Sequence, residues 1–222
     1  MRKTRKKQKQ KQKTKAKGKG KGNGKGKGKT QQKGGKIIGK GMSGFVHYPA
    51  LQCKISTENP PDSDSYVSKV SSKKSAEKEF KNTEALRALK GSEEFAIYPE
   101  FMCEYNEKQN LLFSKFGGYS LVHYYSFLEN LAYTKNADKK KEFNEEYFNE
   151  VFKALEVLKE KVKWLNENGI YHNDISFDNI LYNEETKKVY LIDFEDRGKS
   201  RNDSKGVKSL LDDLEDFKKR IN

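Results

Sequence analysis

The sequence predicts a mixed α+β fold behind a basic leader, and three observations predict it. Apolar and aromatic segments of strand length gather between residues 36 and 116. A long amphipathic pattern over about 144–168 indicates a helix, and two short strand-like segments follow it. Residues 1–36 carry 17 of the 46 Lys and Arg residues and no acid, which leaves 29 bases against 32 acids elsewhere. The net charge of +14 therefore comes from the leader, and the rest of the chain is mildly acidic.

The leader, residues 1–36, alternates lysine with glycine and glutamine and contains no aromatic residue. Such a segment has nothing to offset the entropy of ordering, so we expect it to be disordered and the folded domain to cover 37–222. Dense lysine attracts polyanions, with nucleic acid as the first candidate partner. Anionic lipid, a nuclear-import signal around Arg5, and a solubilising tail are the alternatives.

Composition also excludes several classes of protein. No run of about 18 apolar residues is present, so no transmembrane segment is expected. The positive leader lacks a following apolar segment, so a secretory signal is not indicated. Two cysteines, Cys53 and Cys103, are too few for a disulfide scaffold and have no zinc-site spacing. The default expectation is a reduced intracellular compartment, cytoplasmic or nuclear.

The first half of the domain is predicted to hold five strands and one inserted helix. Glycine turns and alternating apolar residues delimit the strands, Pro60-Pro61 marks a loop, and a run without Gly or Pro indicates the helix. The strands are expected over 36–41, 44–53, 65–70, 95–105 and 110–116, the loop over 54–64, and the helix over 74–90 with Gly91 at its end.

The second half is predicted to be mainly helical. The clearest helix, about 144–168, has apolar residues spaced by four and three, so that they share one face, and Gly169 ends it. Those residues are Val151, Leu155, Leu158, Val162 and Leu165. The other expected elements are helices over 119–131 and 206–220 and strands over 179–182 and 188–193.

A glycine-rich motif lies at the start of the domain. Gly39, Gly41, Gly44 and Val46 fit the pattern G-x-G-x-x-G-x-V. Glycine lets backbone N–H groups approach phosphate oxygens without a Cβ between them. Because the next residues read as a strand, a strand–turn–strand loop over phosphates fits better than a Rossmann turn. A plain glycine hairpin is the alternative.

Lys69 lies between apolar residues in a short strand, where a lysine can reach a phosphate, although an exposed strand lysine is the simpler interpretation. Three glutamates on the following helix, Glu77, Glu79 and Glu84, are candidates to pair with it. Glu79 shares a helical face with Thr83, so we favour it over the other two.

An apolar strand with Ser114 and Phe116 runs into Gly117-Gly118. The backbone of such a connector can hydrogen-bond the edge of an adenine, although a Gly-Gly pair is also common in ordinary turns.

The most specific motif follows the long helix directly. His172, Asp174 and Asn179 fit the pattern H-x-D-x-x-x-x-N, and Asp193 ends an apolar strand. In phosphoryl transfer an aspartate accepts the proton of the attacking hydroxyl, and an asparagine and a second aspartate bind Mg²⁺. A capping aspartate and a structural histidine would each be ordinary alone, but they do not explain the order and spacing of all these motifs.

Taken together, the motifs resemble those of the protein-kinase-like superfamily over about residues 37–195. The resemblance implies a two-lobed fold, with an N-lobe over about 37–116, a C-lobe over about 117–222, and ATP between them. It implies that Asp174 is the catalytic base and that Asn179 and Asp193 are metal ligands. It further implies that ATP is bound by Gly39, Gly41, Gly44, Val46, Lys69, Glu79, Ser114 and Phe116.

The departures from the family pattern indicate a compact, atypical member. Asn173 replaces the arginine that receives an activation-loop phosphate, Ser176 replaces a common lysine, and Glu195 replaces the glycine of the metal motif. Only 29 residues follow Asp193 and no A-P-E sequence occurs, so a truncated C-lobe is expected. The catalytic-loop sequence resembles atypical kinases of the RIO type, and compact kinase-like proteins of large DNA viruses are similar too.

The predicted function is therefore that of an ATP- and Mg²⁺-dependent kinase acting on a hydroxyl, with Ser or Thr of a protein as the expected acceptor. A small-molecule acceptor is a further option. The alternative is a pseudokinase, or a nucleotide-binding scaffold tethered to nucleic acid by the leader.

Overall fold

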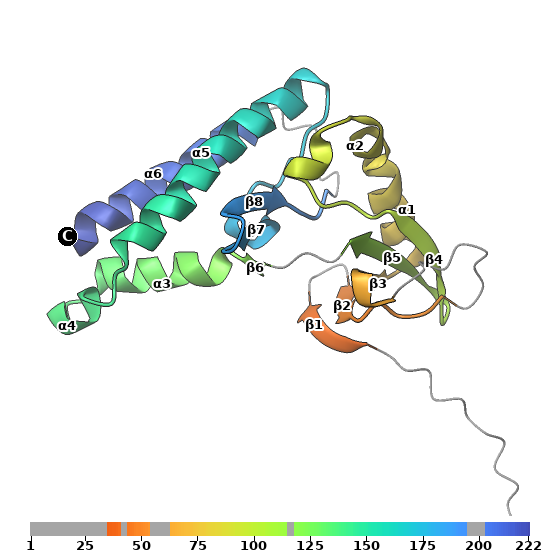
Figure 1. Ribbon diagram of the computed structural model, residues 1–222, viewed down its shortest axis with the longest axis horizontal. Helices are drawn as coiled ribbons and strands as arrows, with labels where there is room; N and C mark the ends of the chain where they lie inside the picture. Colours follow the sequence, from red (N-terminus) through yellow and green to blue (C-terminus); the bar gives the residue numbers. More distant parts are fainter. Residues whose placement is uncertain (1–34, 41–43, 54–62, 115–117, 195–202) are drawn as a thin grey trace, which may run out of the picture. The chain divides into compact units, whose positions relative to one another are not determined.

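The computed structural model describes residues 35–40, 44–53, 63–114, 118–194 and 203–222, and Lys33–Asn222 form one compact unit. The unit has a mixed α+β fold, as the sequence predicts (Figure 1). A five-stranded antiparallel sheet fills its first half, and helices with a three-stranded antiparallel sheet fill its second. Among the described residues, no helix is both long and apolar enough to cross a membrane.

All five predicted strands of the first half are present, in the order β1-β2-β3-β5-β4. β2 stops at Tyr48, earlier than predicted, because Pro49 has no N–H for the ladder and the chain turns away there. β4 begins only at Phe101, so residues 95–100 are not part of the strand predicted over 95–105. The strands are β1 (Lys36–Lys40), β2 (Gly44–Tyr48), β3 (Tyr66–Ser71), β4 (Phe101–Tyr105) and β5 (Lys108–Ser114).

Alternate residues of β5 pack on opposite faces of this sheet. Leu111 and Phe113 pack with Ala76 of the first helix on one face, whereas Leu112 packs with Ala50 on the other. The strand period of two accounts for the alternation. Each face of the sheet is therefore covered, one by a helix and one by the segment that follows β2.

That segment, residues 49–53, is here called the strap, and it runs from β3 to β5 to β4. Its backbone hydrogen-bonds first to β3 and then to a buried asparagine of β5. The contacts are Ala50 N to Tyr66 O at 3.1 Å, Leu51 N to Ser68 Oγ at 3.0 Å, and Asn110 Nδ2 to Leu51 O at 3.1 Å. Most of the predicted loop over 54–64 lies outside the described residues, and a 3₁₀ turn at Ser63–Ser65 leads into β3.

A disulfide joins the end of the strap to β4, which the sequence analysis did not predict. Cys53 and Cys103 are 50 residues apart in the chain, yet their Cα atoms are 5.8 Å apart. The strap brings them together because it crosses to the strand at the edge of the sheet. The spacing of the two cysteines in the sequence does not predict this crossing.

The single helix predicted over 74–90 is two helices in the structure. α1 (Lys73–Asn82) begins at Ser72, whose Oγ accepts a hydrogen bond from Ser75 N at 3.3 Å. α2 (Glu84–Ala88) follows after a break at Thr83. The Thr83 hydroxyl donates to the carbonyl oxygen of Phe80 at 3.1 Å and to that of Glu79 at 3.0 Å, which also accepts the helical hydrogen bond of Thr83 N–H. α2 ends at Ala88 and is followed by the extended residue Leu89, so Gly91 does not end the helix as predicted; with a φ of 95° it lies directly before the next turn instead. A 3₁₀ turn at Ser92–Glu94 comes next.

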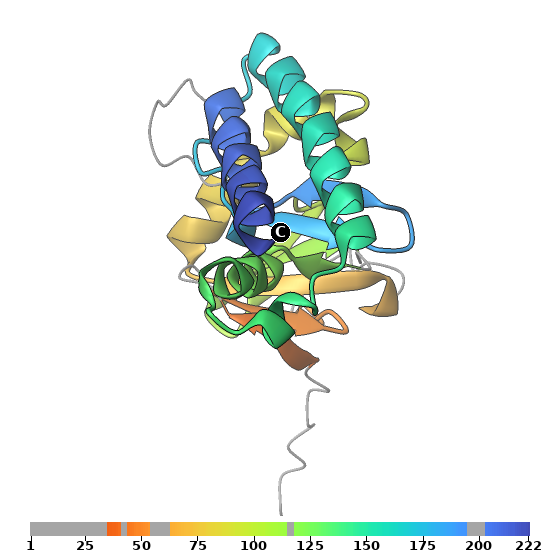
Figure 2. The ribbon, with the colours of Figure 1, turned by 90° about the vertical axis from the view of Figure 1, so that its left-hand side faces the viewer.

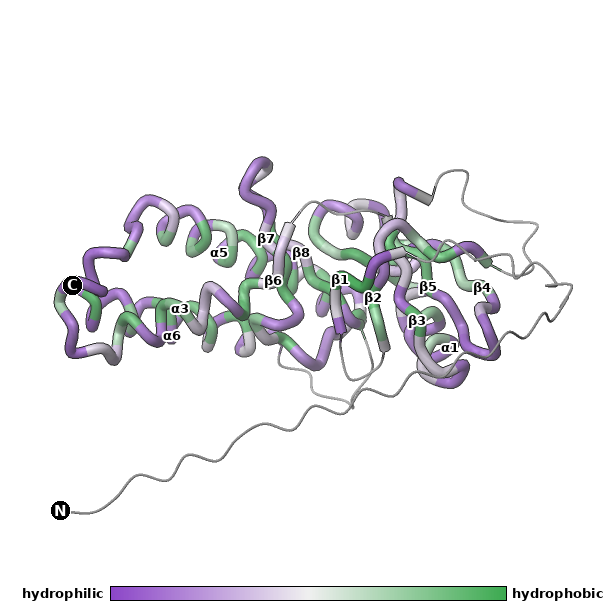
Figure 3. The backbone as a smooth tube through the Cα atoms, turned by 90° about the horizontal axis from the view of Figure 1, so that it is seen from below, coloured by the Kyte–Doolittle hydropathy of each residue, from purple (hydrophilic) through white to green (hydrophobic). Residues whose placement is uncertain are grey.

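The second half contains three longer helices and a small sheet. α5 (Glu145–Glu167) matches the predicted helix, and its five predicted apolar residues are each at most 1% exposed. α6 (Asp203–Ile221) packs antiparallel against α5, with α3 (Val122–Tyr133) beside α6 (Figures 1 and 2). Hydrophobic and hydrophilic stretches alternate along α5, as expected of a helix with one buried face (Figure 3).

Several boundaries in this half differ from the prediction. The helix predicted from residue 119 begins at Val122, because Tyr119–Ser120 form a short strand, β6, that pairs with β7. The last helix begins at Asp203 rather than 206. The remaining elements are α4 (Ala137–Lys140), a 3₁₀ turn at Phe177–Asn179, β7 (Ile180–Asn183) and β8 (Lys188–Leu191).

We predict that the disulfide between the strap and β4 stabilises the folded unit. Because it closes a 50-residue loop, breaking it with dithiothreitol is expected to lower the free energy of unfolding by about 2–4 kcal/mol. Urea unfolding with and without the reductant measures the difference. The Cys53→Ser/Cys103→Ser protein is the control and is expected not to respond. An equal response of both proteins would contradict the prediction.

Candidate functional site

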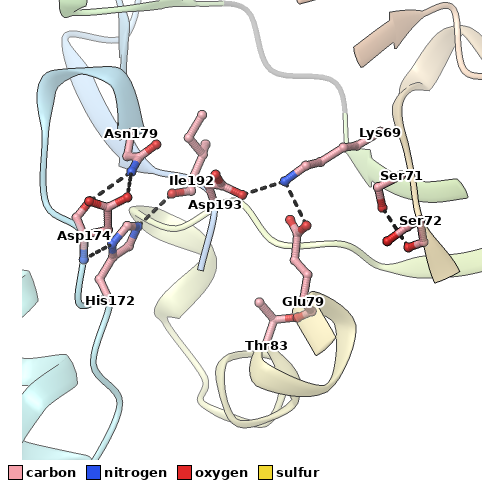
Figure 4. A network of polar contacts seen from close by, with 10 residues as sticks. All are labelled: Lys69, Ser71, Ser72, Glu79, Thr83, His172, Asp174, Asn179, Ile192 and Asp193. Carbon is pink, nitrogen blue, oxygen red and sulfur yellow. Dashed lines mark hydrogen bonds and ion pairs between the residues drawn. The ribbon is translucent and has the colours of Figure 1, made fainter. Parts of the chain in front are cut away.

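Lys69 lies at the centre of a polar network that joins three distant parts of the chain (Figure 4). Its Nζ donates to Glu79 Oε2 at 2.8 Å and to Asp193 Oδ1 at 2.5 Å. β3 carries the lysine, α1 carries Glu79, and Asp193 follows β8 two residues after its end. Only 12% of the Lys69 side chain is exposed, so this ion triad is largely removed from water.

The structure distinguishes among the three candidate glutamates. Glu79 is 1% exposed and contacts Lys69, as the helical face it shares with Thr83 predicts. Glu77 points to solvent and makes only a long ion pair, 3.8 Å, with Lys73. Glu84 is exposed at the start of α2. The helix therefore turns a single glutamate toward the sheet.

The charge of Lys69 is secured by its two partners. Burial by itself lowers the pKa of the ammonium, but the negative charges of Glu79 and Asp193 outweigh this effect, so that the pKa is raised above its ordinary value. Lys69 is therefore a cation at every physiological pH. A buried cation held in place by carboxylates is suited to attract a phosphate.

The register of the sheet places the glycine-rich motif next to this lysine. Gly39 pairs with Val46, Val46 with Lys69, and Lys69 with Leu111, which makes one row across four strands. Directly paired residues of antiparallel strands project from the same face. Three residues that the sequence analysis took from two separate motifs are thus neighbours in space.

Glycine is needed at Gly44 for steric reasons. A Cβ there would lie 2.3 Å from the carbonyl oxygen of Val70, closer than any real contact. At Gly39 a Cβ would lie 3.5 Å from Val46 Cβ, an ordinary contact, so sterics alone do not require glycine there. Gly44 lets β2 approach β3 closely at the first residue of β2.

The segment after α5 forms a loop held by hydrogen bonds among its own side chains. Asn179 Nδ2 donates to the carbonyl oxygen of Asp174 at 2.9 Å and to its Oδ2 at 3.0 Å, which fixes the Asp174 carboxylate. The N–H of Asp174 lies 3.3 Å from His172 Nδ1, and His172 Nε2 lies 2.7 Å from the carbonyl oxygen of Ile192. Ile192 precedes Asp193, so this loop and the Lys69 triad form one network.

His172 is 1% exposed and structural. Burial lowers the pKa of its imidazole, and the hydrogen bond to Ile192 and the nearby carboxylates only partly oppose this shift. The neutral ring then donates from Nε2 to Ile192 and accepts at Nδ1 from Asp174, which matches the observed contacts.

Asp203 also belongs to this network, and the sequence did not point to it. At the first position of α6 and only 4% exposed, it accepts hydrogen bonds from the backbone N–H groups of His172 at 2.6 Å and Asn173 at 2.9 Å. Asn166 of α5 donates to it as well, at 3.3 Å. The carboxylate holds the loop against both long helices. Asp203 lies about 30 residues after His172 and Asn173, so no local sequence pattern connects it to them.

Two residues of the network have backbone conformations that are uncommon outside glycine. Asn173 has a φ of 63° and Asp193 a φ of 65°. Such left-handed residues cost free energy and persist where the surrounding contacts hold them. Here Asp203 holds the first through its N–H, and Lys69 holds the second through its carboxylate.

The donor set fits a Mg²⁺ ion that phosphates help to bind. Within the described part of the chain, no three His, Cys, Asp or Glu side chains cluster closely enough to hold a metal by themselves. Asn179 and Asp193 offer hard oxygen atoms, and Mg²⁺ is usually held by one or two protein oxygens together with substrate phosphates. Asn179 uses its Nδ2 on Asp174, so its Oδ1 is the atom suited to a cation.

Some predicted site residues lie outside the described residues. These are Gly41 of the glycine-rich motif and Phe116, and with them Glu195. The backbone of Ser114 ends β5, paired with Tyr66.

Comparisons with known proteins give a similarity of fold at low sequence identity. No family model and no curated protein matches the chain. The chain is similar to the kinase domain of Mycobacterium tuberculosis PknI, with 13% identity and a TM-score of 0.49 over 73% of this chain and 58% of that one. A mutant of that domain gives 14% identity and a TM-score of 0.48 over the same shares. Rad53 in complex with AMP-PNP gives 18% identity and 0.45, over 72% and 36%.

We predict that Asp203 holds the loop in place. Asp203→Asn replaces one carboxylate oxygen by a donor facing a backbone N–H, so it is expected to lower the free energy of unfolding by roughly 1.5–3 kcal/mol. Amide hydrogen exchange at His172 and Asn173 is expected to speed up. Asp212→Asn, on the exposed face of the same helix, is the control. Unchanged exchange at both amides would contradict the assignment.

We also predict that stability depends on the titration of His172. Its folded pKa lies below the unfolded value of 6.5, so the unfolded state binds the proton more readily. The contribution of His172 is fully present above pH 6.5 and is lost as the pH falls toward the folded pKa. Urea unfolding measures this. Between pH 7.5 and 5, the free energy of unfolding of His172→Gln is expected to fall less than that of the wild type. An identical pH dependence of both proteins would disprove the prediction.

Proposed function

We propose that this chain is an ATP- and Mg²⁺-dependent kinase that transfers the γ-phosphate to a hydroxyl group. The observation that carries the proposal is the Lys69 triad and its continuity with the loop of Asp174 and Asn179. Separately, a buried lysine or an ordered aspartate would be unremarkable as a structural feature. Joined in one network, they supply a cation, metal-binding oxygens and a proton acceptor.

In this proposal the row of Gly39, Val46 and Lys69 is the surface that meets the nucleotide. The Lys69 ammonium contacts a phosphate oxygen, and Glu79 keeps the lysine from turning away. Gly44 allows the strand entering from the turn to lie close to β3. Binding of this kind positions the phosphates, and positioning with charge stabilisation accounts for most of the rate of phosphoryl transfer.

Asn179 and Asp193 would hold Mg²⁺ through Oδ1 and a carboxylate oxygen. The ion, when bound, supplies positive charge that neutralises the phosphate oxygens. Asp193 also contacts Lys69, so the phosphate-binding lysine and the metal-binding carboxylate are aligned by one hydrogen bond.

Asp174 would accept the proton of the acceptor hydroxyl. Asn179 orients its carboxylate through Oδ2, and the backbone of the loop is fixed by Asp203. A base that is held in advance loses little free energy to reorganisation when the hydroxyl arrives. The proposed acceptor is a Ser or Thr of a protein, and a small-molecule hydroxyl is the alternative.

A pseudokinase, which keeps the fold without turnover, is the second candidate function. Asn173 and Glu195 favour it, because both positions depart from the kinase pattern. Against it, Asp174, Asn179 and Asp193 are all retained, and a chain that only binds nucleotide has no use for an oriented base.

One experiment tests the proposal. The protein is incubated with Mg²⁺ and γ-labelled ATP, with mixed protein and small-molecule acceptors, and the label is followed on each. Asp174→Ala is expected to lower the rate by about 10²–10⁴-fold while nucleotide binding persists. Lys69→Met is expected to weaken binding as well, and EDTA to stop the reaction.

Lys188→Met, at an exposed position of β8, is the control for loss of a lysine. Labelling by the wild type and the control but not by Asp174→Ala supports a kinase. Nucleotide binding without label transfer in the wild type identifies a pseudokinase, and normal transfer by Lys69→Met overturns the site.

A further inference from the structure

Arg87 stands out among the residues around the site because it joins α1 to the sheet. The chain has 40 lysines and only six arginines, and Arg87 is one of two arginines in the described part. It lies on α2, half-buried, and its guanidinium does not touch Lys69 or the loop of Asp174. No motif in the sequence singles it out.

The guanidinium of Arg87 makes three hydrogen bonds at the end of α1. Nη2 donates to the carbonyl oxygen of Phe80 at 2.8 Å, and Nη1 donates to Thr83 Oγ1 at 2.9 Å. Nη1 also donates to the carbonyl oxygen of Pro99 at 3.1 Å. Its Cζ lies 4.0 Å from the centre of the Phe80 ring, so the guanidinium also makes a cation–π contact with a side chain of α1.

These contacts cap the last turn of α1. The final carbonyls of a helix have no partner within it, and Phe80 O is one of them. Thr83 is fully buried, and its hydroxyl serves both Glu79 O and Phe80 O, at 3.0 Å and 3.1 Å. Arg87 therefore secures the turn that begins at Glu79, directly and through Thr83.

The third contact ties this turn to the sheet that carries Lys69. Pro99 precedes β4, and the next residue, Glu100, donates its N–H to Leu112 O of β5 at 2.8 Å. β5 in turn pairs with β3 at Leu111 and Lys69. Arg87 therefore links α1, which carries Glu79, to the sheet, which carries Lys69.

We infer that Arg87 is a positioning residue that holds α1 so that Glu79 meets Lys69. The inference rests on the proposed function, in which that pair presents the lysine to phosphate. The planar guanidinium of arginine can donate to a helix carbonyl, a hydroxyl and a carbonyl beside the sheet at the same time. The ammonium of a lysine is a compact single charge that cannot reach all three.

The test measures the Lys69 ammonium directly, without nucleotide. In ¹⁵N-labelled protein, a buried ammonium in an ion pair exchanges its protons slowly enough to be seen by NMR, and Lys69→Met assigns its signal. Arg87→Met is expected to broaden or remove this signal at a temperature where the protein is fully folded. The affinity for Mg²⁺-ATP is expected to fall about tenfold.

Arg220→Met is the matched control, since Arg220 is an exposed arginine of α6 paired with Asp216. Arg87→Lys keeps the charge and stem but not the fork, and Thr83→Val removes one of its acceptors. Both are expected to weaken the Lys69 signal, and they replace Arg87→Met if that protein does not fold.

A folded Arg87 variant with a lower unfolding midpoint but an unchanged Lys69 signal would overturn the inference, because Arg87 would then be merely structural. The two proposals fail separately. A wild-type protein that binds no Mg²⁺-ATP refutes the proposed function, whereas the nucleotide-free Lys69 signal still decides the role of Arg87.

Discussion

The ammonium of Lys69, held between the carboxylates of Glu79 and Asp193, is the contact on which the rest of the site depends. Lys69 and Asp193 are 124 residues apart, so the contact draws the sheet and the segment after β8 together. Burying three charges costs desolvation energy, which is offset only when the geometry is good and the charges remain paired. The triad therefore contributes little net stability, and its value lies in fixing the positions of the three side chains.

The rest of the network supports this triad from the side of the helices. The backbone of Ile192, next to Asp193, contacts His172, and the loop of His172 also carries Asp174. Asp203 then anchors that loop to the start of α6. A neutral histidine suits this position because a buried charge there would need a further partner. Lys69 and Asp174 thus share one scaffold.

Local patterns predicted the main elements well, and tertiary contacts account for the departures. The presence of five strands follows from turn signals and alternating apolar residues, and the buried face of α5 follows from the helical period of 3.6. The break at Thr83 was not predictable, because no Gly or Pro marks it and the contacts made there include those of Arg87, which also reaches Pro99. The sequence predicts the strap as part of a strand, because alternating apolar residues occur both in a segment that pairs with a strand and in a segment that crosses over one.

The sequence by itself determined the split between a basic leader and a mildly acidic domain, the glycine-rich motif, and the spacing from His172 to Asn179. These are local properties, since residues a few positions apart have their relative geometry set by the backbone. Only the tertiary structure decided that Asp193 meets Lys69, that Asp203 anchors the loop, and that Cys53 reaches Cys103. Those choices depend on sheet register and on how distant elements pack, and no short-range pattern encodes either.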